Sequence, residues 1–197
     1  PSGTIEWRED SPSGKGYSVY LNGSRYINLY QPKLLDLQPQ EDFTISLWFK
    51  AEEGVEGYFI AKRESGSIGT EQYSIHLQNN RIYYSVGGVS TFFSEVRVDD
   101  NTWHHVILAN YNDNGTQRYK VFIDGTAITP IGTSGTYTNE VDILIGARRG
   151  SSANTGSGYF YTGLIDDVRI YSRALTAHEV QTLYAQTKDK YISEKSD

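Results

Sequence analysis

The chain has 197 residues, and its 18 Lys and Arg against 24 Asp and Glu give a net charge of −6. This length favours a single domain with one hydrophobic core. The absence of Cys excludes a disulfide framework, a zinc ribbon, an iron–sulfur site and a Cys nucleophile. The acidic balance argues against general electrostatic binding of nucleic acid or anionic membrane, and a neutral partner is expected.

Short runs of β-branched and aromatic residues recur along most of the chain, separated by Gly, Asn, Asp and Ser. This pattern is typical of many short strands. We predict strands at 17–21, 26–29, 43–50, 57–63, 72–78, 81–87, 90–96, 104–111, 118–124, 141–147 and 163–171. The fold class is therefore predicted as all-β.

Alternation within the strands predicts which side chains are buried. Along 43–49, Phe43, Ile45, Leu47 and Phe49 share one face, while Thr44, Ser46 and Trp48 share the other. Asn79-Asn80 and Asp124-Gly125 are favourable two-residue hairpin turns, because these residues tolerate positive φ. The hairpins predict antiparallel sheets.

One helix is predicted near the end of the chain. Thr176 as the N-cap and Glu179 three residues later form a capping box, and Leu175 and Val180 occupy the positions of a hydrophobic staple. Val180, Leu183 and Tyr184 then form an apolar stripe that would dock on the sheets. The charged residues 188–197 are expected to be a tail or linker, which leaves 1–187 as the domain.

Five segments carry a family resemblance, and the last is the most specific: FTISLWFKA (43–51), TWHHVILANYND (102–113), YKVFIDG (119–125), VDILIGA (141–147) and GLIDDVRIYSRALTAHEVQTLY (163–184). They resemble the laminin-G-like, concanavalin A-like jelly-roll domains of secreted bacterial proteins. The resemblance implies an antiparallel two-sheet β-sandwich with one short C-terminal helix. It also implies glycan binding or cell-surface interaction, often with a structural calcium ion, although the family includes glycoside hydrolases.

No catalytic constellation is complete. Jelly-roll glucan hydrolases carry paired carboxylates on one strand, and Glu140 and Asp142 come near this motif, but Leu144 and Ile145 stand where the second Glu would be. His104 and His105 are adjacent on a strand and point to opposite faces, so they are expected to serve packing and hydrogen bonding, with Trp103. No catalytic residue is assigned.

Calcium is the expected cofactor. Asp166 falls on the same strand face as Leu164, Val168 and Ile170, where a carboxylate would be costly unless it were paired or bound to a metal. The resemblance implies that Asp166 binds the ion together with an N-terminal loop around Gly16, Asn22 and Gly23. The alternative for Asp166 is a set of hydrogen bonds to backbone amides. Asp167 is expected to form a surface ion pair with Arg169.

Sugar recognition requires exposed aromatic faces beside planar hydrogen-bonding groups. One candidate set lies in the loop-rich segment 148–161, and a second lies on strands or loops that are expected nearby. The predicted ligand residues are Arg148, Arg149, Asn154, Tyr159 and Tyr161 from the first set, and Arg63, Tyr83 and Glu95, with Glu64, from the second. The alternative is that these tyrosines are strand residues and that both arginines are solvated.

The sequence therefore predicts a non-catalytic, extracellular carbohydrate-binding module of a larger protein. A protein-binding adhesion domain is the first alternative, and a divergent glycoside hydrolase or lyase is the second. No stretch is apolar enough to span a bilayer. The start at Pro1, with neither an initiator Met nor a signal-peptide pattern, favours a mature fragment or an excised module.

Overall fold

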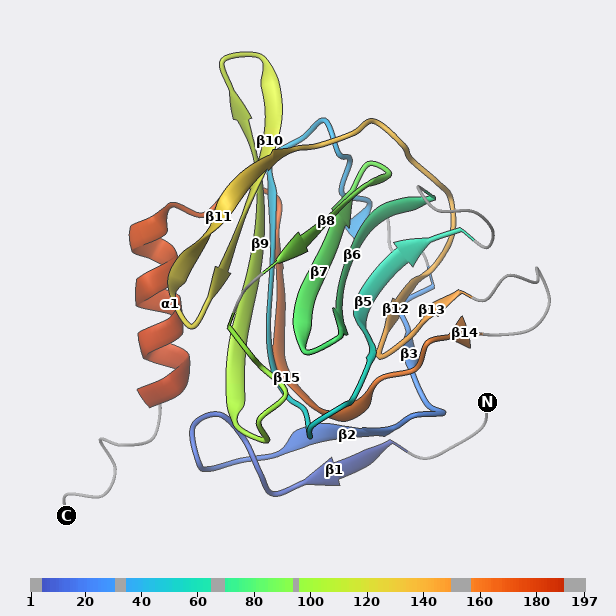
Figure 1. Cartoon of the computed structure of the whole chain (residues 1–197), viewed down its shortest axis with the longest axis vertical. Coiled ribbons are helices and arrows are strands. Elements are labelled where there is room, and N and C mark those ends of the chain that lie inside the picture. Colours follow the sequence, from blue (N-terminus) through green and yellow to red (C-terminus); the bar gives the residue numbers. More distant parts are fainter. Residues whose placement is uncertain (1–4, 31–34, 65–69, 94–95, 150–156, 190–197) are drawn as a thin grey trace.

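The computed structural model is an all-β sandwich with one C-terminal helix, as predicted (Figure 1). It describes residues 5–30, 35–64, 70–93, 96–149 and 157–189. The strands are β1 (Glu6–Arg8), β2 (Ser18–Asn22), β3 (Ile27–Asn28), β4 (Phe43–Lys50), β5 (Gly57–Arg63), β6 (Glu71–Gln78), β7 (Arg81–Val86), β8 (Val89–Phe93), β9 (Trp103–Asp113), β10 (Thr116–Ile123), β11 (Thr126–Thr133), β12 (Ile143–Ile145), β13 (Arg148–Arg149), β14 (Ser157–Gly158) and β15 (Thr162–Tyr171). The helix is α1 (Ala177–Asp189).

Two antiparallel sheets form the sandwich. The seven-stranded sheet has the order β1-β2-β15-β4-β9-β10-β11, and the six-stranded sheet has the order β3-β12-β5-β6-β7-β8. Strands β13 and β14 form a small separate pair. The pattern of β-branched runs does not predict β1, β13 or β14, which are only two or three residues long.

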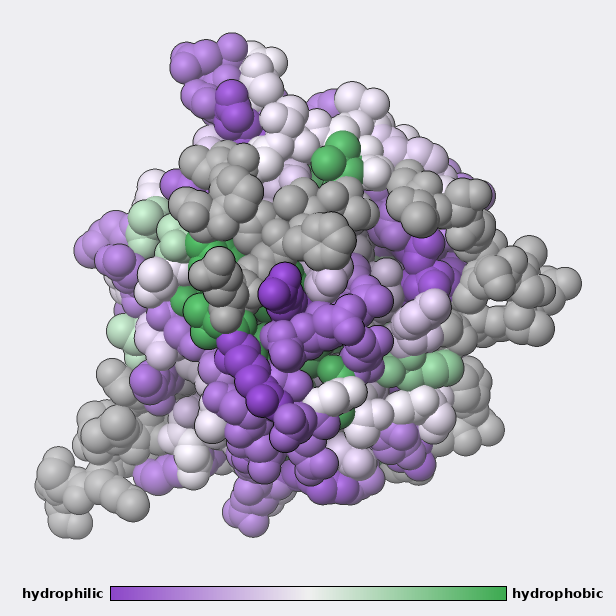
Figure 2. Space-filling model, in the orientation of Figure 1, coloured by the Kyte–Doolittle hydropathy of each residue, from purple (hydrophilic) through white to green (hydrophobic). Residues whose placement is uncertain are grey.

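The core lies between the two sheets, and the alternation predicted along β4 is confirmed. Phe43, Ile45, Leu47 and Phe49 belong to one apolar cluster that also receives side chains from the six-stranded sheet, such as Phe59 and Ile75. Thr44, Ser46 and Trp48 belong to the opposite, outer face of the seven-stranded sheet. Figure 2 shows that the surface is mostly hydrophilic on the face in view, with hydrophobic side chains confined to small areas.

Both predicted hairpin turns are present. Asn79 and Asn80 have φ of 49° and 58° and join Gln78 to its partner Arg81. Asp124 and Gly125 have φ of 51° and 76° and join β10 to β11. Positive φ at both central residues matches the twist of the strands, so these turns set the register of each hairpin.

Helix α1 begins with the predicted capping box. The Glu179 N–H donates to Thr176 Oγ1 at 3.2 Å, and the Thr176 N–H donates to Glu179 Oε2 at 2.8 Å. Leu175, Val180 and Leu183 pack against the outer face of the seven-stranded sheet. The helix therefore covers that sheet, and Figure 1 shows it on the opposite side of the molecule from β12, β13 and β14. No helix of the described residues is long and apolar enough to cross a membrane.

Candidate functional site

The two adjacent histidines of β9 are structural, as predicted. His105 stacks on Trp48 with ring centroids 4.8 Å apart, and its Nε2 lies 2.7 Å from Ser46 Oγ. His104 points to the other side of the sheet, where its ring lies 5.8 Å from that of Phe49. Trp103 donates its indole N–H to Asp10 Oδ1 at 2.7 Å. The histidines therefore cannot chelate one metal together.

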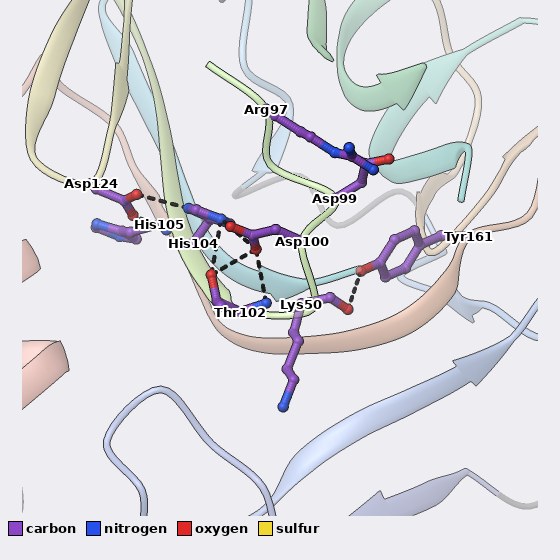
Figure 3. Close-up of polar contacts among 9 residues, drawn as sticks. All are labelled: Lys50, Arg97, Asp99, Asp100, Thr102, His104, His105, Asp124 and Tyr161. Carbon is purple, nitrogen blue, oxygen red and sulfur yellow. Dashed lines mark hydrogen bonds and ion pairs between the residues drawn. The ribbon is translucent and has the colours of Figure 1, made fainter. Parts of the chain in front are cut away.

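His104 also fixes the loop before β9 (Figure 3). Its Nδ1 lies 2.8 Å from Asp124 Oδ2 and its Nε2 lies 3.2 Å from Asp100 Oδ1. Burial favours the neutral ring, but the hydrogen bonds and charges of Asp124 and Asp100 outweigh it and raise the pKa of His104. Asp100 also accepts from the Thr102 N–H at 2.9 Å, so the cluster is a structural clamp.

The predicted orientation of Asp166 is wrong. Ile165 is 2% exposed and lies in the core, so the half-buried Asp166 faces the outer side of the sheet, opposite Trp48. A bulge follows, with φ of 47° at Asp167, and it returns Val168 to the core. Asp166 Oδ1 accepts from the Asp167 N–H at 2.7 Å, and the predicted ion pair of Asp167 with Arg169 is confirmed at 2.8 Å.

Asp166 and Gly16 line one cavity of about 150 Å³ between the N-terminal loop and β15. Its lining includes oxygen-bearing side chains from both sides: Ser11, Ser13, Asp166, Asp167 and Thr187. Carboxylate, hydroxyl and backbone oxygens are ligands that Ca²⁺ accepts, so these residues are compatible with the expected ion. The described residues hold no cluster of three or more His, Cys, Asp or Glu that could bind a metal.

Asn22 and Gly23 do not share this site, contrary to expectation. Asn22 lies opposite Thr162 in the β2–β15 ladder, four residues from Asp166 along the strand. Four residues of a strand span about 13 Å, too far for ligands of one ion. The Asn22 side chain instead accepts from the Ser24 N–H at 3.2 Å.

A second candidate site lies on the outer face of the six-stranded sheet, which is the face directed away from the core and is called the ligand face below. Its aromatic row crosses three adjacent strands. Tyr58 stacks on His76 with ring centroids 4.2 Å apart, and His76 stacks on Tyr83 at 5.1 Å. The register pairs these residues directly across β5, β6 and β7. Neighbouring strands thus align three planar rings.

Several polar atoms of the ligand face are buried without a hydrogen-bond partner among the described residues. They are Glu71 Oε2, Ser74 Oγ, His76 Nδ1 and Ser85 Oγ. Ser74 and Ser85 are direct partners across β6 and β7 and are at most 1% exposed. Leaving such groups unpaired costs free energy, and unpaired groups clustered on one face point to a ligand that supplies the missing partners.

Charge also gathers on the ligand face. The Arg63 Nε lies 2.9 Å from Glu71 Oε1, and both side chains are almost completely buried. Burial, followed by the charges of Arg63 and Arg148, lowers the pKa of His76 to about 3. His76 is therefore neutral near pH 7, so one nitrogen of its ring donates a hydrogen bond and the other accepts one.

Tyr159 brings an exposed aromatic ring to the margin of this face. It is 60% exposed, its φ is 54°, and its carbonyl accepts from the Tyr58 N–H at 3.2 Å. The Arg148 guanidinium lies 4.1 Å from the centre of the Tyr159 ring and 5.6 Å from that of Tyr58. A bulky residue at positive φ is strained, and such strain concentrates at functional positions.

The structure brings together most of the predicted ligand residues that it describes. Arg63, Tyr83, Arg148 and Tyr159 join the ligand face, although they come from the two separate candidate sets. Arg149 lies beside β12 and is paired with Asp142 at 3.1 Å. Asn154 and Glu95 lie outside the described residues.

Tyr161 is the predicted ligand residue that the structure contradicts. Its side chain is 0% exposed and packs in the core against Phe59, with ring centroids 4.9 Å apart. Its hydroxyl donates to the Lys50 carbonyl oxygen at 2.7 Å (Figure 3). A ring held in this way cannot stack on a ligand.

Tyr58, Glu71, Ser74, His76 and Ser85 were not predicted as ligand residues. A partial signal is present in β6, where Ser74 and His76 alternate with the buried Tyr73, Ile75 and Leu77. Polar residues opposite a core face are usually solvated, so alternation alone does not distinguish a binding face from an ordinary solvent-exposed face.

The carboxylates considered for catalysis do not form a pair. Glu140 is exposed, and Asp142 accepts from the Asn28 side-chain amide at 2.9 Å in addition to its ion pair with Arg149. Ile143 and Ile145 of the same segment lie in the core.

Comparison with known proteins agrees with this architecture. Residues 13–181 match the concanavalin A-like lectin/glucanases superfamily. The adhesion G-protein coupled receptor V1 of Danio rerio is 26% identical over 178 residues, which cover 85% of this chain and 3% of the receptor.

Among solved structures, domain 4 of AbnA, an extracellular arabinanase from Geobacillus stearothermophilus in complex with arabinotriose, has a TM-score of 0.63 at 23% identity. This alignment covers 93% of this chain and 82% of that one. The CBM40 of the Ruminococcus gnavus IT-sialidase bound to alpha2,3 sialyllactose has a TM-score of 0.67 at 13% identity, covering 92% of this chain and 100% of that one. These likenesses concern the fold. With a family match that spans most of its length, the chain belongs to the concanavalin A-like lectin/glucanases superfamily.

Proposed function

We propose that this chain is a non-catalytic carbohydrate-binding module of a larger extracellular protein, and that it binds a glycan on the ligand face. The observation that carries the proposal is the combination of a stacked aromatic row with buried polar atoms that lack partners. Two structural neighbours are described as complexes with arabinotriose and alpha2,3 sialyllactose, and one of them belongs to an extracellular enzyme.

The two kinds of group match the two kinds of surface on a sugar. The C–H faces of a sugar ring pack on aromatic rings, and Tyr83 and Tyr159 have accessible ring surface. Sugar hydroxyls both donate and accept, so they can satisfy Ser74 Oγ, Ser85 Oγ and His76 Nδ1. A single site with so few contacts should bind weakly, and display of several copies of the module would raise the avidity.

The arrangement of charge favours binding over hydrolysis. A glycosidase needs one carboxylic acid to protonate the leaving group and a second carboxylate across the bond. On the ligand face, Glu71 is held by Arg63 at 2.9 Å and Asp142 by Arg149 at 3.1 Å. Each of these carboxylates is thus paired with a guanidinium and not with the other, so they do not form the acid and nucleophile pair of a glycosidase.

Calcium in the cavity beside Asp166 belongs to the same proposal. Asp166, Asp167 and the backbone oxygens around Gly16 would hold it, and the ion would join the N-terminal loop to β15. Its role would be structural, because the cavity lies beside Trp48, on the sheet opposite the ligand face.

A glycan array that includes arabinotriose and alpha2,3 sialyllactose tests the function. The wild-type chain should bind at least one glycan, and His76→Ala should weaken that binding at least tenfold. His178→Ala is the matched control, since His178 is exposed on α1, which covers the opposite sheet. If His76→Ala leaves binding unchanged, the glycan site does not lie on the ligand face. Silence of the array would contradict the function and favour the protein-binding alternative.

A further inference from the structure

Arg148 differs from Arg63 and Arg149, two other arginines described at the ligand face. Arg63 faces Glu71 at 2.9 Å and Arg149 faces Asp142 at 3.1 Å, whereas Arg148 has no ion pair among the described residues. Its Nη1 donates to the Arg149 carbonyl oxygen at 3.1 Å, and its Nε is buried with no hydrogen-bond partner among those residues.

Stacking explains the position of Arg148 but not its unused hydrogen-bonding capacity. The guanidinium lies over Tyr159 and near Tyr58, at the margin of the aromatic row. A guanidinium carries five N–H donors in a planar fork that matches a carboxylate. A stacked arginine with free donors is thus oriented in advance for an anion.

The charges that act on His76 are positive, although the chain as a whole is acidic. The charges of Arg63 and Arg148 contribute, after burial, to lowering the pKa of His76 to about 3. The same field that opposes a proton on His76 favours a negative charge placed nearby. This local field departs from the neutral partner that the net charge of −6 suggests.

We propose that the ligand is an acidic glycan, and that Arg148 binds its carboxylate while the sugar ring packs along the aromatic row. This inference rests on the proposed function and narrows it to one class of sugar. Burying the carboxylate against Arg148 would supply the acceptor that its Nε lacks, whereas a neutral sugar would leave the charge of Arg148 uncompensated.

Matched acid and ester probes provide the test. The array should carry alpha2,3 sialyllactose, tetragalacturonate and a hyaluronan hexasaccharide, each beside its carboxyl methyl ester, together with the neutral lactose, arabinotriose and cellotetraose. The strongest wild-type ligand should be one of the acids, and its methyl ester should bind at least tenfold more weakly. Arg148→Gln should weaken binding of the acid at least tenfold and binding of the ester less than threefold.

Arg118→Gln is the control, because Arg118 pairs with Asp113 on the β9–β10 hairpin, on the other sheet. It should leave the affinity unchanged. If a neutral glycan binds most strongly and His76→Ala abolishes that binding, the acidic class is wrong and the proposed function stands. Equal binding of acid and ester would also overturn the inference. If no probe binds the wild-type chain, the proposed function and this inference both fail.

Discussion

Trp48 and Thr187 connect the seven-stranded sheet to the last turn of the helix. The Trp48 indole N–H donates to Thr187 Oγ1 at 2.9 Å, and the Trp48 ring stacks on Tyr184 with centroids 5.5 Å apart. Both residues of the hydrogen bond are buried. The helix is thus fixed to the sheet by a specific polar contact in addition to its apolar stripe.

Thr187→Val should destabilise the fold by about 1 to 3 kcal/mol, because it leaves the buried indole N–H of Trp48 without an acceptor. Urea unfolding followed by tryptophan fluorescence measures the loss. Thr182→Val is the control, since Thr182 is exposed on the same helix. Equal losses in the two variants would mean that helix propensity, not the Trp48 contact, determines the effect.

Removal of His104 should change how stability depends on pH. The folded-state pKa of His104 is raised above its unfolded value near 6.5, so its ion pairs stabilise the fold fully below about pH 6.5 and are lost as the pH rises through the folded pKa. His104→Gln should therefore lose most stability, relative to wild type, at pH 6 and progressively less at higher pH. Urea unfolding between pH 6 and 9 measures this difference. A difference that is constant across the range would contradict it.

His105 should have the opposite effect on how stability depends on pH. Burial lowers the pKa of His105 to about 4, so its neutral ring stabilises the fold above about pH 6.5, and that contribution is lost as the pH falls towards 4. His76 behaves in the same way, with a pKa of about 3. His105→Gln should therefore flatten the decline in melting temperature of the protein between pH 6.5 and 4. An unchanged decline would show that other groups determine it.

Calcium should raise the melting temperature. An ion that binds only the folded state at one hundred times its Kd stabilises by about 2.7 kcal/mol. For a domain of this size that corresponds to about 5 to 10 °C. EGTA should reverse the shift, Asp166→Asn should abolish it, and Asn22→Ala should preserve it, because Asn22 lies away from the cavity. An identical melting temperature with calcium and with EGTA would contradict calcium binding in this cavity.

Gly57 should be intolerant of any side chain. A Cβ at Gly57 would lie 2.5 Å from the Tyr161 Cα and 2.6 Å from the Phe160 carbonyl oxygen, both backbone atoms. Gly57→Ala should cost about 1 to 3 kcal/mol from overpacking alone. Gly54→Ala is the control: Gly54 also has positive φ, but no atom lies within 4 Å of its Cβ position. Urea unfolding of both variants separates steric overlap from backbone strain.

Local features were predictable from the sequence. The Asn79-Asn80 turn and the Thr176–Glu179 capping box depend on residues at most three positions apart, so their chemistry is visible in the chain itself. The faces of β4 were predictable as well, because the register of that strand shifts only in its pairing with β15.

The ligand face was harder to predict because bulges interrupt the alternation of two of its strands. The β5–β6 register shifts between Tyr58 and Ile60 and again between Lys62 and Arg63. Strict alternation of side chains along β5 would put Tyr58 and Arg63 on opposite faces, so the sequence pattern does not bring them together. Tyr161 shows the second limit: the carbonyl that fixes its hydroxyl belongs to Lys50, 111 residues away in the chain.

The helix covers one sheet and leaves the ligand face of the other uncovered by any helix of the described residues, so the sandwich has two unlike exteriors. Substitutions beneath α1, as at Ile107 or Phe122, remove packing and should reduce the yield of folded protein. Substitutions of Ser74 and Ser85 on the ligand face remove hydroxyls that make no hydrogen bond among the described residues, and these should reduce binding at unchanged yield. If every position were substituted and scored separately for expression and for glycan capture, positions beneath α1 should mainly affect expression. Positions on the ligand face should mainly affect capture.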